Sequence, residues 1–448
     1  MQSENFNNEN LGYKFTLYDY HAIEKAEIIL DGITVLAGEN GCGKSTLSRW
    51  LYYIVNAASN WETYIFEEFK QEMLNLVRRF DQLAMDVARK ERRELLEQME
   101  LIENLKYVDI SSFYRVADLA RDAVYMLSER LFSFLTVSNN VSFRSKRVFS
   151  FLDIELNDKE PGVIVNEFLK KYLEYLETRT NDIVEKAEKR EPKDFYQVIH
   201  NRYRVMDDTP SRVQLSEEGV KILKKERIGV LFNLDSAIYV DTPMALQNTI
   251  YGLGWSDNVF WRDLQSRMLE KKHDTPANMK KILLRLKMLM KGYVKADKQP
   301  YGREELRYVR KDGLNIKLED TATGLKTFAY IQRLLENGHL NEKTLLLIDE
   351  PEAHLHPQWV VEFAKLLVAL HKEVGVKVMV ASHNPDMVAA IHRITQKEDL
   401  IARTHFYQTF AQKDSSKYVY KDLGGSIAEI FESFNIALSR IQSYGRDE

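Results

Sequence analysis

The sequence is short of cysteine and of long apolar runs, and both shortages narrow the classes of protein to consider. One cysteine in 448 residues excludes an intrachain disulfide framework and suits a reducing cytoplasm, where we expect the protein to act. No apolar run reaches the ~18 residues of a membrane-spanning helix, so we expect no membrane partner. The first ten residues, MQSENFNNEN, are polar and lack the apolar segment of a signal peptide.

The patterns of several hydrolytic centres are also missing. We find no HNH motif, no Ser/His/Asp or Cys/His set, and no Glu with an Asp-x-Asp pair for the metals of a nuclease. The net charge of −4 neither favours nor excludes nucleic acid as a partner. A hydrophobic fraction of 44% is nevertheless ample for a large core, and the length favours two or three domains.

One segment carries a phosphate-binding pattern, GENGCGKS, from Gly38 to Ser45. It matches G-x-x-x-x-G-K-[ST], in which glycines let consecutive backbone N–H groups face one anion. An expected strand at 33–37 precedes it, and an expected helix at 46–55 follows with its N-terminus facing the phosphates. We therefore predict a site for ATP and Mg²⁺, in which Lys44 reaches the β- and γ-phosphates and Ser45 holds the metal ion. The predicted nucleotide-binding residues of the loop are Gly38, Glu39, Asn40, Gly41, Cys42, Gly43, Lys44, Ser45 and Thr46.

A second segment, TLLLIDE from Thr344 to Glu350, has the pattern of a buried strand that ends in two carboxylates. Its apolar run is typical of a strand buried on both faces of a parallel sheet, and α/β proteins bind ligands at the carboxyl ends of such strands. Asp349 would hold Mg²⁺ through water, and Glu350 would polarise the attacking water. Neighbouring strand residues point to opposite faces, so the chain must splay here if both are to serve one site.

These residues and two further segments resemble a known family. DEPEAHLHP, from Asp349 to Pro357, is similar to the corresponding segment of ABC-class ATPases. More narrowly, it resembles the soluble branch that includes RecF, the SMC proteins, the SMC-like double-strand-break repair ATPases and the overcoming-lysogenization-defect nucleases. VMVASHNPDMV, at 378–388, ends a strand in Ser382-His383, like the switch histidine of that family. EDTATGLKTFAYIQ, at 319–332, resembles the degenerate signature of AAA-type ATPases from bacterial defence systems.

The resemblance implies roles that the phosphate-binding loop alone does not assign. His383 would contact the γ-phosphate and act in catalysis together with Lys44 and Glu350. Thr323 and Gly324 would cap the γ-phosphate that a second subunit binds. The signature departs from the Leu-Ser-Gly-Gly-Gln form of transporters, which argues against a transporter.

A further residue, Gln247, is expected to act near the metal ion. It follows an expected strand at 237–240, and the resemblance implies that it links Mg²⁺ to the helical lobe.

The spacing of these motifs and the family resemblance together predict an α/β fold. Two sequence-distant lobes would form one ABC-type P-loop head, with a mainly helical region inserted between them. We expect the first lobe at 1–60, the helical insertion at 61–205, and the second lobe, with the signature, second carboxylate motif and switch histidine, at 206–448.

Local patterns predict further elements. Apolar residues three and four apart from Phe66 to Val87 fit a short coiled-coil arm or, as we prefer, one long helix packed in a helical subdomain. The Asp-Gly pairs Asp31-Gly32 and Asp312-Gly313 are typical of hairpin turns.

The stretch 271–298 is rich in lysine and arginine. Thr275-Pro276 is typical of a helix start, and the helix would present Lys280, Lys287 and Lys291 on one face. These lysines could contact a nucleic-acid backbone, although a solvated amphipathic helix explains the same pattern.

We interpret the chain as a soluble ABC-class ATPase that forms a homodimer or a higher oligomer around Mg-ATP. Our first hypothesis is a regulatory or sensor subunit of a bacterial antiphage defence complex, of the Septu or retron-linked type, with a separate effector nuclease or toxin. The alternative is a RecF-like or SMC-like DNA-repair ATPase, which the basic stretch favours. The energy subunit of a membrane transporter is the least favoured hypothesis.

Overall fold

The computed structural model shows two compact units. The first combines the residues up to Ser59 with those from Phe195 onward, and the second spans Asn60–Asp194. The first unit is therefore built from two segments that are far apart in the sequence. The structure describes residues 12–87, 92–109, 112–137, 160–241, 258–273, 275, 279–298, 304–413 and 415–432.

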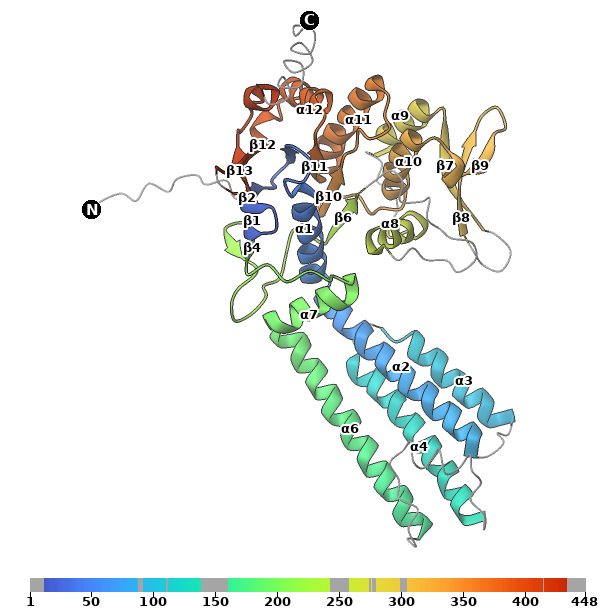
Figure 1. Cartoon of the computed structure of the whole chain (residues 1–448). Helices are drawn as coiled ribbons and strands as arrows, with labels where there is room; N and C mark the ends of the chain where they lie inside the picture. The colour runs from blue at the N-terminus through green and yellow to red at the C-terminus, as the bar shows by residue number, and fades with distance from the viewer. Residues whose placement is uncertain are drawn as a thin grey trace, which may run out of the picture. The chain divides into compact units, whose positions relative to one another are not determined.

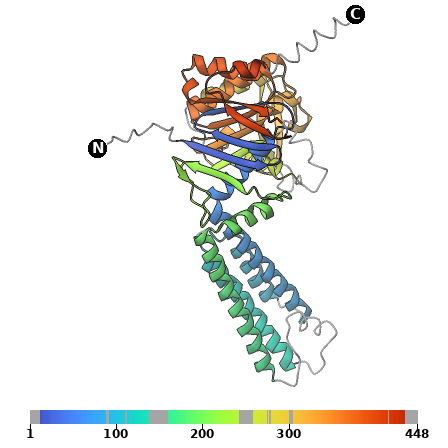
Figure 2. The same cartoon turned by 60° about the vertical axis from the view of Figure 1, so that its left-hand side comes forward.

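Among the described residues, a sheet of ten strands forms the centre of the first unit. Its order is β5-β4-β1-β2-β13-β12-β3-β11-β10-β6, so strands from both segments lie side by side. Figures 1 and 2 show the blue N-terminal strands among later strands drawn in green, orange and red. The strands are β1 (Tyr13–Tyr20), β2 (Ile23–Ile29), β3 (Ile33–Ala37), β4 (Arg212–Glu217), β5 (Val220–Lys221), β6 (Ser236–Val240), β10 (Thr344–Asp349), β11 (Lys377–Ser382), β12 (Thr404–Ala411) and β13 (Tyr418–Asp422).

The five strands from β12 to β6 are parallel, and β3 lies in their interior. Ile33 of β3 is opposite Val378 of β11 on one side and Thr404 of β12 on the other. β11 pairs in parallel with β10, and β10 with β6. The segments that follow these strands therefore begin at one common edge of the sheet, where α/β proteins place their ligands.

Helices cover both faces of the parallel strands. Alternate side chains, such as Val35 of β3 and Ile348 of β10, belong to a core that includes residues of α8 to α12. α1 contacts β6, β10 and β11 from the other face. Because every side chain of β3 and β10 is buried, two-sided packing accounts for their continuous apolar sequences. The helices are α1 (Lys44–Ser59), α8 (Val259–Leu269), α9 (Lys280–Met290), α10 (Thr323–Glu336), α11 (Pro357–Ala369) and α12 (Pro385–Lys397), with the short turns η3 (Leu318–Asp320), η4 (Leu370–Val374) and η5 (Ile401–Arg403).

The two Asp-Gly pairs have different outcomes. Asp312-Gly313 joins antiparallel β8 (Glu304–Arg310) and β9 (Asn315–Lys317), which form a small sheet with β7 (Gly292–Lys298), so this hairpin is confirmed. The prediction of a hairpin at Asp31-Gly32 was wrong. β2 lies between β1 and β13, whereas β3 lies between β12 and β11. The reason is burial: β2 alternates in exposure and suits a position nearer the margin of the sheet, while β3 is buried on both faces.

The helix predicted from Thr275-Pro276 begins later than expected. α9 starts at Lys280. The hydroxyl of Thr275 does not cap this helix, because it donates to the backbone carbonyl of Glu336, 2.9 Å away. Residues 276–278 lie outside the described part of the chain.

The second unit consists of long helices. α2 packs against α4, and α4 against α6; Figure 1 shows these helices running alongside one another. Phe66, Phe69, Met73 and Phe80 of α2 are buried. The apolar spacing of α2 therefore belongs to one helix packed in a helical subdomain, the interpretation we preferred. The helices are α2 (Trp61–Val87), α3 (Arg92–Lys106), α4 (Phe113–Val137) and α6 (Pro161–Lys189), and α7 (Pro192–Tyr203) follows them in the sequence.

Candidate functional site

The phosphate-binding loop follows β3 and leads directly into α1. Gly41 and Gly43 have φ angles of 82° and 95°, in the left-handed region that favours glycine. A Cβ at Gly43 would lie 2.6 Å from Cγ1 of Ile23, and a Cβ at Gly38 would lie 2.0 Å from Oγ1 of Thr409. Gly38 and Gly43 are therefore required by close neighbours as well as by the expected phosphate.

Lys44 lies against the loop. Its Nζ donates to the carbonyl oxygens of Gly38 at 2.9 Å and Glu39 at 2.8 Å, and it lies 3.6 Å from Sγ of the buried Cys42. The hydroxyl of Tyr420 donates to the carbonyl of Cys42 at 3.1 Å. These contacts hold the ammonium group beside backbone N–H groups that can bind an anion.

The loop and the end of β10 line one open pocket of about 350 Å³. His21 and Ala22, which the sequence did not single out, also line it. They belong to the turn between β1 and β2, where His21 has a positive φ and its ring stacks on Tyr20 with centroids 4.1 Å apart. No motif marks this turn, so only the fold reveals it. The predicted residues that line the pocket are Asn40, Gly41, Gly43, Lys44, Ser45, Thr46, Asp349 and Glu350.

Asp349 is buried at the end of β10, on the face that α1 covers. Its Oδ1 accepts from the hydroxyl of Ser48 at 2.8 Å, and its Oδ2 accepts from the hydroxyl of Tyr239 at 2.7 Å. Burial raises the pKa of Asp349, although hydrogen bonds from Ser45, Tyr239 and Ser48 act in the opposite direction. Neither Ser48 nor Tyr239 was anticipated, because each becomes a partner only through the packing of α1 and β6 on β10.

Glu350 follows β10 with a φ of 46°, which is unusual for a residue other than glycine. Its backbone N–H donates to the carbonyl of Ala381 at 2.8 Å. Neighbouring strand residues point to opposite faces, so the chain has to leave the strand geometry if both carboxylates are to serve one site. The left-handed backbone at Glu350 does this, and Glu350 lines the same pocket as Asp349. Oε1 of Glu350 lies 3.3 Å from Nδ1 of His383, so the structure brings these two candidates together.

A buried carboxylate that the sequence analysis missed lies beside this pair. Oε1 of Glu352 accepts from the hydroxyl of Ser382 at 2.6 Å and from the backbone N–H of His383 at 3.3 Å. It also lies 3.9 Å from Nδ1 of His383. Burial raises the pKa of Glu352, against the lowering effect of the hydrogen bond from Ser382. Glu352 is the third carboxylate of DEPEAHLHP, so this segment of the sequence could have indicated it.

Thr323 and Gly324 form the first turn of α10. A Cβ on Gly324 would lie 3.1 Å from the carbonyl oxygen of His354, so this turn packs closely on the segment after Glu350. Neither residue is among the described residues that line the pocket. The structure therefore does not bring the predicted signature residues to the nucleotide site of their own chain.

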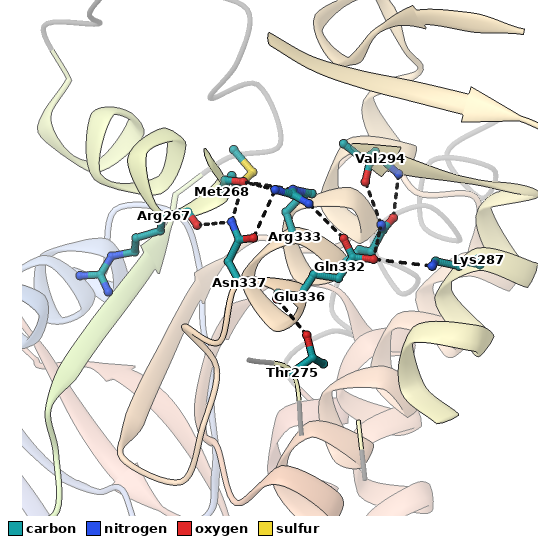
Figure 3. Close-up of polar contacts among 9 residues, drawn as sticks. All are labelled: Arg267, Met268, Thr275, Lys287, Val294, Gln332, Arg333, Glu336 and Asn337. Carbon is teal, nitrogen blue, oxygen red and sulfur yellow. Dashed lines mark hydrogen bonds and ion pairs between the residues drawn. The ribbon is translucent and has the colours of Figure 1, made fainter. Parts of the chain in front are cut away.

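Polar contacts hold the far end of α10 in place (Figure 3). Gln332 exchanges two hydrogen bonds with the backbone of Val294, at 2.9 and 3.0 Å. The guanidinium of Arg333 donates twice to the carbonyl of Met268, at 3.0 and 2.9 Å. The side-chain amide of Asn337 donates to the same carbonyl at 2.8 Å. These contacts fix the C-terminal half of α10 to α8 and β7, and so help to hold the helix that carries Thr323 and Gly324.

The residues at the pocket suit a magnesium ion. Ser45 and Asp349 supply hydroxyl and carboxylate oxygens, the donors that Mg²⁺ prefers. Gln247, the third predicted metal residue, lies outside the described residues, which stop at Asp241 and resume at Asn258.

The predicted basic face exists on α9 and the residue after it. Lys280, Lys287 and Lys291 are all exposed. Nζ of Lys287 lies 3.7 Å from Oε1 of Glu336 and 5.5 Å from the ring centroid of Tyr293. The ammonium group of Lys287 therefore already interacts with groups of its own chain.

A glycine loop that ends at a helix N-terminus, with a buried carboxylate at the end of a nearby parallel strand, defines a P-loop nucleotide-binding protein. The chain belongs to the AAA ATPase domain family, whose sequence model matches residues 13–388. Family and fold agree with the α/β P-loop ATPase class and inserted helical region expected from the sequence.

Curated relatives match a short part of the chain. The energy-coupling factor transporter ATP-binding protein EcfA3 of Clostridium perfringens (strain ATCC 13124) is 39% identical over 72 residues, which are 16% of this chain and 25% of that protein. The energy-coupling factor transporter ATP-binding protein EcfA2 of Clostridium perfringens (strain SM101) is 38% identical over 72 residues, which are again 16% of this chain and 25% of that protein. The chain thus spans about a quarter of the length of these relatives.

Solved structures of SMC heads are also similar. A Smc head bound to the C-winged helix domain of ScpA has 12% identity and a TM-score of 0.37, with 94% of this chain and 98% of that chain covered. The SMC head domain from Thermotoga maritima has 11% identity and a TM-score of 0.35, with 92% and 98% covered.

Proposed function

We propose that the chain binds and hydrolyses Mg-ATP, and that two copies associate around the nucleotide. The observation that supports this most is the meeting of the loop residues, Asp349 and Glu350 at one open pocket. Lys44 and the N-terminus of α1 would hold the phosphates, while Ser45 and Asp349 would hold Mg²⁺, which neutralises phosphate charge. Glu350 would orient the attacking water, with His383 beside it.

The proposed dimer explains why Thr323 and Gly324 do not line their own pocket. The first turn of a helix offers free N–H groups to an anion, here the γ-phosphate bound by a second copy. Association would therefore depend on bound ATP and end on hydrolysis.

The test combines two variants with light scattering after size-exclusion chromatography. Glu350→Gln should bind ATP, fail to hydrolyse it and accumulate as a dimer, because the carboxylate is lost but the phosphate contacts remain. Lys44→Ala should neither bind nor dimerise. A Glu350→Gln protein that stays monomeric with ATP bound would contradict the dimer proposal.

For the biological role we propose the regulatory or sensor subunit of a bacterial antiphage complex, with a separate nuclease or toxin as effector. The compact helical unit in place of a long arm, and the absence of a recognisable nuclease pattern in the sequence, favour this role. Cells carrying the gene with its neighbours should resist phage, and Lys44→Ala should abolish resistance. Equal plaque numbers with both proteins would contradict it.

DNA repair is the alternative, and the exposed Lys280 and Lys291 favour it. Stimulation of ATP hydrolysis by duplex DNA, which fades as salt rises and is lost in a Lys280→Glu, Lys291→Glu variant, would support this alternative. Turnover indifferent to DNA would leave the antiphage proposal ahead.

A further inference from the structure

We infer that Glu352 is a positioning residue for the proposed hydrolysis, and that it acts through the Ser382–His383 segment. The inference depends on the proposed ATPase function, because it concerns the geometry of the same site. Glu352 is 7% exposed, and its carboxylate joins two separate segments of the chain. One is the turn after β10 that carries Glu350, and the other is the end of β11 that carries His383.

The contacts of Oε1 fix the backbone around His383. Oε1 accepts from the Ser382 hydroxyl at 2.6 Å and from the His383 N–H at 3.3 Å. The Ser382 hydroxyl in turn accepts from the N–H of Asn384 at 3.1 Å. Asn384 caps α12, because its Oδ1 accepts from the N–H groups of Asp386 and Met387. One carboxylate oxygen thus ties three consecutive residues to the turn after β10.

The same turn is held at its other end as well. The N–H of Ala353 donates to the carbonyl of Glu350 at 2.9 Å, and the N–H of Leu355 donates to the carbonyl of Glu352 at 2.9 Å. With both segments fixed, Nδ1 of His383 faces Oε1 of Glu350 at 3.3 Å. Glu352 thus adds side-chain contacts at Ser382 and His383 to the backbone hydrogen bond that already joins Glu350 to Ala381.

The second oxygen of Glu352 distinguishes this role from simple stabilisation. Oε2 is buried, and it has no hydrogen-bond partner among the described residues. Burying an unpaired carboxylate oxygen costs free energy, so a residue selected only for stability would satisfy or remove it. The cost is understandable where an acceptor is needed to hold the segment that carries His383.

The experiment measures kcat and KM for ATP hydrolysis in full-length variants. Glu352→Ala should lower kcat by about tenfold to a hundredfold while KM changes less than about twofold, because misplacement affects the reacting geometry and not the phosphate contacts. Glu352→Gln should recover most of kcat, since its amide oxygen can accept from the same two donors. Ser382→Ala removes one of the two donors to Glu352 and should lower kcat in the same direction as Glu352→Ala. Ser128→Ala is its matched control, because Ser128 is also buried and donates locally, to the carbonyl of Tyr125.

A double-mutant cycle separates positioning from a general loss of stability. If Glu352 acts through His383, then Glu352→Ala combined with His383→Ala should be no slower than His383→Ala alone. Additive losses, or an unchanged kcat in Glu352→Ala, would overturn the inference while leaving the ATPase proposal intact. An inactive wild-type chain that also fails to bind ATP would instead overturn the proposed function itself.

Discussion

The two ends of the central strands both bury charged side chains, but they satisfy them differently. At the amino end, Nε2 of His405 lies 2.9 Å from Oδ1 of Asp31, and Nδ1 lies 3.6 Å from Oδ2 of Asp422. At the carboxyl end, Asp349 accepts from hydroxyl groups, and Glu352 keeps one oxygen without a hydrogen-bond partner among the described residues.

The difference separates a structural end of the sheet from the end where we propose the nucleotide site. A histidine enclosed by two carboxylates has its partners already and contributes to folding. Buried carboxylates on neutral donors, and a left-handed backbone at Glu350, both cost stability. Such costs are expected where a site must remain ready for a phosphate, a metal ion and a water molecule.

The largest expected effect comes from glycine at the carboxyl end. Gly43→Ala should abolish measurable ATP binding, because the new Cβ would lie 2.6 Å from Ile23 at a positive φ and would displace the loop. Gly41→Ala is the matched control, because Gly41 also has a positive φ but no atom lies within 4 Å of the position of a new Cβ. It should cost only about 1–2 kcal/mol of stability without nucleotide. Thermal unfolding and ATP titration of both variants check this, and equal effects would contradict the steric reason.

The next effect belongs to the amino end. Burial lowers the pKa of His405, but hydrogen bonds to Asp31 and Asp422 outweigh it and raise the pKa from 6.5 to about 9. A raised histidine pKa adds stability that is complete below pH 6.5 and is lost as the pH rises through about 9. The shift corresponds to about 3 kcal/mol.

His405→Gln should therefore lower the free energy of unfolding by about that amount near pH 6 and by little above pH 9. Denaturant unfolding of both proteins across this range measures the difference. The ATPase activity of the folded variant should be unchanged, because His405 lies at the opposite end of the strands. If the difference in the free energy of unfolding between the two proteins persists at alkaline pH, the ion pairs of His405 are not its source.

The smallest effect concerns backbone strain at Glu350. Glu350→Gly should raise the stability of the nucleotide-free protein by about 0.5–1 kcal/mol net, because relief at φ 46° exceeds the added freedom of the unfolded chain. Hydrolysis should be lost. Glu350→Gln keeps the strain and serves as the comparison for unfolding measurements. If the glycine variant is no more stable than the glutamine variant, the strain is not a cost at this position.

Local sequence predicted the elements whose signals are local. The strand at 33–37 matches β3 in full, and the strand predicted within Thr344–Glu350 matches β10 at 344–349, because two-sided burial imposes a continuous apolar pattern. The hairpin prediction at Asp31-Gly32 failed because both partners of β3, and β13 beside β2, come from more than 300 residues later in the sequence, and no turn signal encodes them.

The same limit applies to the site. The meeting of the loop with Asp349 and Glu350 at one pocket was predictable, because the loop has a fixed glycine spacing and the carboxylates follow a continuous apolar strand. Tyr239, Ser48 and His21 were not, because each reaches the pocket or Asp349 only through the order of strands and the placement of α1.

The position of β3 between β11 and β12 also has a consequence for biosynthesis. About 300 residues separate the phosphate-binding loop from Thr344, and both neighbours of β3 come later still. At roughly 5–20 residues per second, a ribosome would need about 20–70 s to supply them after the loop is made. The contiguous helical unit Asn60–Asp194 can fold during that interval, whereas the nucleotide pocket must wait for the last strands. A nascent chain stopped before β11 would therefore carry a complete phosphate-binding sequence and no ability to bind ATP.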